Sequence, residues 1–134
     1  MHLLSAGVLL PLSDSKEQDT GYTPMNDDIQ QIHIDIESAT EQAALGAAVT
    51  RLMKNKDFKK VILDGLFKNE AVRLVLLKGD PSMQSDEAQK ELLKQMDGIG
   101  SLRQYLYAME MLGKRAAGAI EDYQEELETL RNEA

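Results

Sequence analysis

The feature that most constrains this chain is a regular apolar repeat in its C-terminal part. No proline occurs from Asp86 to Asn132, and apolar or small residues recur there at alternating steps of three and four. This heptad spacing places one apolar stripe along a helix and is typical of helices that pack against other helices. The stripe consists of Ile99, Leu102, Leu106, Met109, Gly113, Ala116, Ile120, Tyr123, Leu127 and Leu130. The sequence therefore predicts a long C-terminal helix, which a kink or short break could interrupt near Gly98–Gly100.

The kinds of apolar residue agree with this prediction. Aromatic residues make up 4% of the chain and tryptophan is absent, so Leu, Ile, Met and Ala supply most of the apolar surface. Contacts between helices need mainly these residues, whereas a compact core usually draws on aromatic bulk. We therefore expect an all-α protein in which the long helix packs against one or two shorter helices, as a hairpin or bundle with coiled-coil-like packing. The absence of cysteine excludes a disulfide framework and thiolate chemistry.

The first of the shorter helices is predicted from a capping box. Ser38 and Glu41 have the spacing at which each side chain reaches the other's backbone amide, so we expect a helix from about Ser38 to Lys54. The stretch Asp28–Glu37 fits two structures. Its isoleucines alternate with polar residues as in a strand, and they also fall at helical spacing, so it is either a short extended arm or an extension of the helix.

The second shorter helix is predicted to begin at Asp57, whose carboxylate can accept from the amides of the first turn. Gly79-Asp80-Pro81 should end it, with Gly79 in the left-handed conformation and proline unable to continue the helix. Gly65 is either a break or a tolerated interior glycine. This second helix is predicted to have two apolar faces. The first consists of Phe58, Val61, Ile62, Leu66 and Phe67. The second, which is broad enough to suggest burial, consists of Val72, Leu74, Val75, Leu76 and Leu77.

The N-terminal segment lacks a periodic apolar pattern. Pro11 and Pro24 bracket turn-forming residues, so we expect residues 1–26 to be a flexible tail and residues 27–134 to form one helical domain. The leucine-rich opening lacks the basic residue and the cleavage site of a signal peptide. Met25 directly precedes a helix-start sequence, which leaves open whether translation begins at Met1 or at Met25.

The charge distribution narrows the classes of partner. The net charge of −8 disfavours non-specific binding to nucleic acid or to an anionic membrane. Residues 51–78 nevertheless carry eight Lys and Arg against three acids, and residues 119–134 carry six acids with Arg131. This separation favours an antiparallel arrangement, or a basic partner such as the Arg51–Lys60 segment of a neighbouring copy. We therefore expect protein partners, as a homo-oligomer or within a large assembly.

No residue pattern in the chain indicates catalysis, a cofactor or a metal. The acidic residues around His33 match no known ligand spacing, and Ser101 has no histidine nearby in sequence. Gly98-Ile99-Gly100 lacks the third glycine, the preceding strand and the lysine of a phosphate-binding loop. The sequence therefore predicts a protein that is not an enzyme.

The heptad stripe is the candidate interaction site. If the two shorter helices cover only half of the long helix, its acidic C-terminal end keeps an uncovered apolar stripe that would bind a partner. The candidate interaction residues are Leu106, Met109, Ala116, Ile120, Tyr123, Leu127 and Leu130. The small residues of 113–119 are predicted to pack closely against the small residues of 43–48.

Several short runs carry a family resemblance. They are residues 57–67 (DFKKVILDGLF), 70–74 (EAVRL), 99–106 (IGSLRQYL) and 111–113 (MLG). In these runs the chain resembles small helical proteins encoded in tailed-bacteriophage genomes, often near head and packaging genes. The resemblance covers about residues 57–130 and carries no catalytic residues. It implies a virion- or assembly-associated protein that acts through helix contacts, in the host cytoplasm or in the virion. The alternative is an acidic adaptor or inhibitor that docks on a host enzyme or nucleic-acid-binding protein.

Overall fold

A computed structural model describes residues 24–133, and all the regular elements among them are helical. Helix α2 spans Pro24–Lys54 and helix α5 spans Asp86–Glu133. Between them lie α3 (Lys56–Phe58), the π-helix η1 (Lys59–Glu70), α4 (Ala71–Lys78) and the short 3₁₀ helix η2 (Pro81–Met83). The predicted all-α class, with a long C-terminal helix packed against a shorter one, is confirmed.

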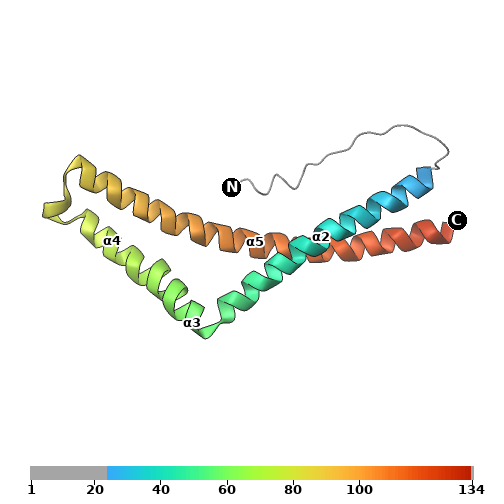
Figure 1. The fold of residues 1–134 in the computed structure, drawn as a ribbon, viewed down its shortest axis with the longest axis horizontal. Coiled ribbons are helices and arrows are strands. Elements are labelled where there is room, and N and C mark those ends of the chain that lie inside the picture. Colours follow the sequence, from blue (N-terminus) through green and yellow to red (C-terminus); the bar gives the residue numbers. More distant parts are fainter. Residues whose placement is uncertain (1–23, 134) are drawn as a thin grey trace.

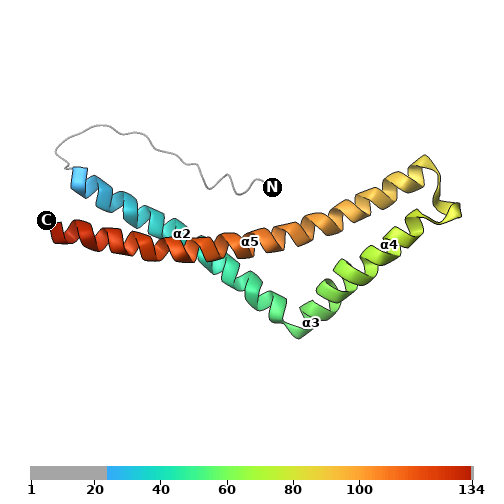
Figure 2. The same cartoon turned by 180° about the vertical axis from the view of Figure 1, so that it is seen from behind.

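The molecule is elongated, and α5 runs through its whole length (Figure 1). Helix α2 lies along the C-terminal half of α5, and the two helices run antiparallel. The segment from α3 to α4, residues 56–78, is called the arm. It turns away from the end of α2 and returns to the start of α5, so the chain forms a bent pair of helices beside one long helix (Figure 2). At ~1.5 Å per residue the 48 residues of α5 extend roughly 70 Å.

Helix α2 begins earlier than the sequence predicted. It is helical from Pro24, so Asp28–Glu37 is part of the helix, and the capping box at Ser38 is wrong. Proline suits the first turn of a helix because its missing N–H has no partner there. The isoleucines of this stretch follow the helical period, with Ile32 buried and Ile34 exposed. The predicted boundary between residues 26 and 27 thus falls inside α2, and the rest of the predicted tail lies outside the described residues.

The arm is capped by Asn55 rather than by Asp57. Asn55 has extended backbone angles, and its side chain accepts a 2.9 Å hydrogen bond from the N–H of Phe58. Asp57 lies within the first turn instead, where its charge favours the helix dipole without capping it. The sequence predicted only Asp57 as the cap, so Asn55, two positions earlier, is a correction that the structure supplies.

This assignment of the cap gives a testable result. Asn55→Ala should lower the free energy of unfolding by about 0.5–2 kcal/mol, because the amide of Phe58 loses its acceptor. Asp57→Ala should have a smaller effect. Urea denaturation followed by circular dichroism measures both, and a larger loss for the Asp57 variant would contradict the observed cap.

The arm keeps its helical path through Gly65 and ends where predicted. Gly65 lies inside the π-helical part, where an added Cβ would come within 3.2 Å of the Lys60 carbonyl oxygen. Gly79 is right-handed, with φ −90° and ψ −2°, so the predicted left-handed conformation is wrong. The helix ends because Asp80 becomes extended before Pro81, which disfavours helical geometry in the residue that precedes it.

The turn into α5 is held by side chains. Asp80 accepts from the hydroxyl and the backbone N–H of Ser82, and these bonds lower the pKa of its carboxyl. The side-chain amide of Gln89 donates to the Lys78 and Met83 carbonyls, and Gln84 also donates to the Lys78 carbonyl. Helix α5 then continues without a break through Gly98 and Gly100, so the short break that the sequence allowed does not occur.

The contact between α2 and α5 centres on two glycines. A Cβ added to Gly46 would lie 2.6 Å from the Gly113 Cα, and the reverse distance is also 2.6 Å. The predicted close approach of the two small-residue stretches is therefore confirmed. Next to this crossing, Val49, Leu106 and Met109 form a buried cluster, with Phe58 and Phe67 of the arm packed against it.

Candidate interaction surfaces

The predicted interaction residues lie against α2. Leu106, Met109 and Leu127 are buried. Ile32 and Leu127 each lie 14 residues from the glycine crossing on the two antiparallel helices, and both are buried, which places them opposite each other. The remaining four candidates, all half-buried, are Ala116, Ile120, Tyr123 and Leu130.

The premise that the end of the stripe is left uncovered is therefore wrong. Helix α2 begins 14 residues before the predicted start at Ser38, and the added length runs beside the last turns of α5 (Figures 1 and 2). From Leu106 onward the heptad stripe forms the internal contact between α2 and α5, whereas Leu102 is exposed. Binding of a partner through these seven residues stays a prediction, and it would require α2 to move away.

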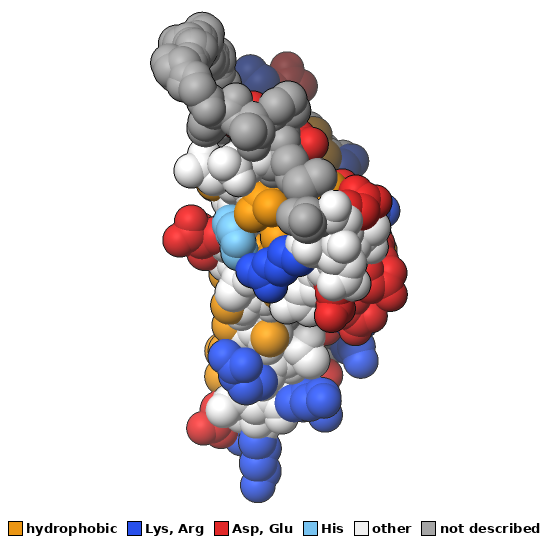
Figure 3. Space-filling view, turned by 90° about the vertical axis from the view of Figure 1, so that its right-hand side faces the viewer, with side chains coloured by type: hydrophobic (Ala, Val, Ile, Leu, Met, Phe, Trp, Pro, Cys, Tyr) orange, Lys and Arg blue, Asp and Glu red, His pale blue; other side chains and the backbone are white. Residues whose placement is uncertain are grey.

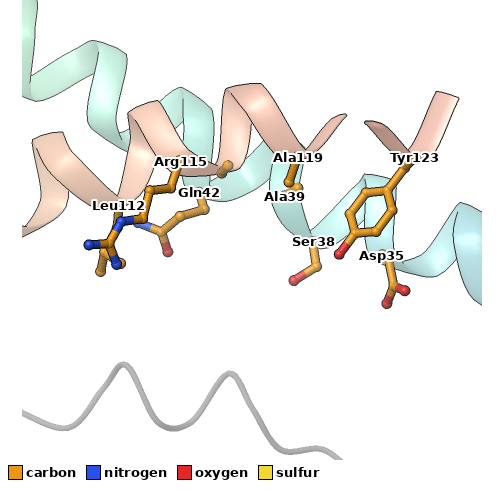
Figure 4. Close-up of a pocket in the computed structure, with 9 residues that line it drawn as sticks. Asp35, Ser38, Ala39, Gln42, Leu112, Arg115, Ala119 and Tyr123 are labelled. Atoms are coloured by element: carbon orange, nitrogen blue, oxygen red, sulfur yellow. The ribbon is translucent and has the colours of Figure 1, made fainter. Parts of the chain in front are cut away.

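A groove with both polar and apolar lining residues lies between α2 and α5 beside the crossing. It has a volume of about 420 Å³ and a floor of alanines that includes Ala39 and Ala119. Figure 4 shows Tyr123 beside Ser38 and Asp35, with Arg115 and Gln42 further along the groove. None of these polar side chains is buried, so the groove provides no desolvated charge that would fix a small ligand.

The exposed apolar surface lies elsewhere. In the described part of the chain seven hydrophobic side chains are buried, whereas twelve large ones are exposed, from 38% at Leu102 to 70% at Leu76. Scattered exposed residues are ordinary, but these include two groups that share a helix face. The sequence indicated that Val72–Leu77 forms a broad buried face. Instead only Leu74 is buried, and Leu77 is half-buried.

The first exposed group is the arm patch, defined as Val72, Val75 and Leu76. These residues are 56%, 59% and 70% exposed, and their spacing of three and four places them on one face of α4. Basic side chains border the patch. Arg73 donates to both carboxylate oxygens of Glu70, which lowers the pKa of that carboxyl, and Lys68 pairs loosely with Asp64 at 3.7 Å.

The second group is the α2 stripe, defined as Ile34, Leu45 and Leu52. They are 56%, 41% and 41% exposed. Separations of 11 and 7 residues are close to three and two helical turns, so the side chains share one face. Glu37 and Glu41 lie along this face, and neither forms an ion pair with any described residue. No sequence pattern singles out this stripe, because its three residues are 11 and 7 positions apart and form no continuous periodic run.

Acidic and basic side chains are concentrated at opposite ends of the long axis of the molecule. The end where α2 begins and α5 finishes holds eleven carboxylates and Arg131, counted over residues 24–41 and 121–133. The arm holds six Lys and Arg against three acids. Figure 3 views the molecule from the acidic end: Asp and Glu side chains gather on one flank, with Lys and Arg side chains toward the bottom of the view. The predicted separation of charge therefore becomes a separation in space.

Comparison of the chain with known protein families, curated proteins and solved structures found no match. Among residues 24–133, no helix is long and apolar enough to cross a membrane. Within the same part of the chain, no three His, Asp or Glu side chains lie close enough together to hold a metal ion.

Proposed function

We propose that this protein is a helical assembly or binding protein, which acts through helix contacts with other proteins rather than through catalysis. The observation that supports this most is the excess of exposed over buried large hydrophobic side chains among the described residues. Six of the twelve exposed residues are ordered into a stripe and a patch, and such surfaces are typical of interaction sites. Glu37 and Glu41 lie along the stripe, and the arm that carries the patch has six Lys and Arg against three acids, which favours a specific partner over general adhesion.

The proposed type of assembly rests on the resemblance to small helical proteins of tailed bacteriophages. It favours a virion- or head-assembly-associated component, present in the particle or in the infected host cell. The acidic end supports the alternative, an adaptor or inhibitor that docks on a basic surface of a host enzyme or nucleic-acid-binding protein.

Site-specific photo-crosslinking in the source cell tests the proposal. A photoreactive amino acid at Leu45 or at Val75 should give covalent adducts of discrete mass, because a bound protein would cover these side chains. The same amino acid at Gln104, an exposed polar position of α5, is the control and should give none. Adducts to a stoichiometric particle component favour assembly, and adducts to one host protein favour the adaptor. If neither apolar position yields an adduct, the proposed function is wrong.

A further inference from the structure

We infer that the partner of both exposed surfaces is a second copy of this chain. In the dimer the α2 stripe of each copy lies against the arm patch of the other, and a two-fold axis relates the two contacts. The inference rests on the proposed function and deepens it by naming the partner. Its first support is that one chain carries both surfaces, on α2 and on α4, and its own packing covers neither of them.

The second support is charge complementarity along the two contacting faces. Glu37 and Glu41 lie along the α2 stripe. Lys68 and Arg73 border the arm patch and pair there with Asp64 and Glu70, but the arm as a whole carries six Lys and Arg against three acids. Burial of apolar groups beside opposite charges is favourable, whereas the same contact between like charges is strongly disfavoured. The pairing of stripe with patch would give Glu37 and Glu41 the basic partners that the described monomer does not provide.

The third support concerns the relative direction of the copies. Figure 1 places the basic arm and the acidic end at opposite ends of the molecule. Parallel association would bring arm against arm and acidic end against acidic end, and both contacts would be repulsive. Antiparallel association brings each arm to the partner's α2. Since a two-fold dimer makes this contact twice, it uses the stripe and the patch of both copies and closes on itself rather than continuing as a chain.

Light scattering after size exclusion, over a range of protein concentrations, tests the dimer. The wild-type protein should have twice the monomer mass. Val72→Asp with Leu76→Asp should raise the dimer dissociation constant by about 100-fold or more, since central apolar contacts dominate such interfaces. Met111→Asp is the matched control, because Met111 is 57% exposed, like Val72, and lies on α5 outside both surfaces. Circular dichroism should show the same helicity for all variants.

Charge reversal tests the pairing itself. Glu37→Lys with Glu41→Lys, and separately Lys68→Glu with Arg73→Glu, should each give a monomer. An equimolar mixture of the two variants should recover the dimer mass, because each contact of the mixed dimer again joins opposite charges. A misfolded variant could not be rescued in this way.

Three results would overturn the inference: a wild-type monomer at every concentration, a dimer unaffected by these substitutions, or a mass that keeps growing with concentration beyond twice the monomer mass. A wild-type monomer that still forms photo-adducts with a different protein at Leu45 or Val75 would refute the dimer and leave the proposed function standing. The absence of all adducts would remove the proposed function as well.

Discussion

Replacement of Gly113 with alanine is expected to lower the free energy of unfolding by about 1–3 kcal/mol, the usual cost of overpacking a filled contact. The new Cβ would lie 2.6 Å from the Gly46 Cα and 3.2 Å from the Gln42 carbonyl oxygen. Both neighbours are backbone atoms of α2, so they cannot rotate away. Helix α2 would have to separate from α5 along the crossing, which would loosen the cluster of Val49, Leu106 and Met109.

The matched control for this substitution lies on the same helix. A Cβ added to Gly118 would meet no neighbouring atom within 4 Å, so Gly118→Ala should raise the free energy of unfolding by about 0.5–1 kcal/mol through helix propensity alone. The two changes are chemically identical and should have opposite signs in urea denaturation. Stabilisation by Gly113→Ala would show that the two helices do not approach this closely in solution.

Replacement of Leu127 with aspartate is expected to destabilise the acidic end of the molecule. Leu127 is 7% exposed and lies opposite Ile32, and loss of a buried leucine side chain costs about 2–5 kcal/mol even without a new charge. The new carboxylate would enter an apolar contact whose surroundings already include Glu125, Glu126 and Glu128. We therefore expect a clear fall in the free energy of unfolding, together with faster amide hydrogen exchange in the first turns of α2.

Gln124→Asp supplies the control, because it adds the same charge at an exposed position one turn earlier and should change the free energy of unfolding by less than about 0.5 kcal/mol. Leu127→Asp distinguishes the two uses of the heptad stripe. If the stripe is an internal contact, stability falls. Loss of an oligomer with unchanged stability of the monomer would instead mean that the stripe binds a partner.

Local sequence was enough to predict the class of fold and its closest contact. The heptad stripe of 99–130 predicted α5, because an apolar period of 3.5 is a property of one segment. The pairing of residues 43–48 with 113–119 was predictable for a similar reason, since runs of small side chains permit a close approach of backbones. Gly79-Asp80-Pro81 likewise ended the arm, because the restriction imposed by Pro81 is local.

The sequence did not reveal which apolar faces of the helices are buried. The candidate interaction surfaces are the faces that stay exposed, so they could not be predicted either. Leu74 and Leu76 are two residues apart with the same side chain, yet they are 1% and 70% exposed because only one faces α5. Similarly, Ile32 is buried and Ile34 is exposed. An apolar side chain has the same tendency toward burial at every position. The local sequence therefore cannot show whether another helix covers that side chain.

The sequence by itself thus determined that this protein is helical, that its C-terminal helix is long and unbroken by proline, and that its charges separate along the chain. Apolar periodicity and the effect of proline are properties of one segment of the chain, and charge is a sum over its residues, so the sequence is enough to give all three. The tertiary structure alone decided that α2 reaches back to Pro24 and covers the end of α5, that Asn55 caps the arm, and that the α2 stripe and arm patch face outward. These features depend on the bend between α2 and the arm and on the close approach of Gly46 and Gly113, where a Cβ added to either glycine would lie 2.6 Å from the opposite Cα. Together they set the relative placement of helices distant in sequence.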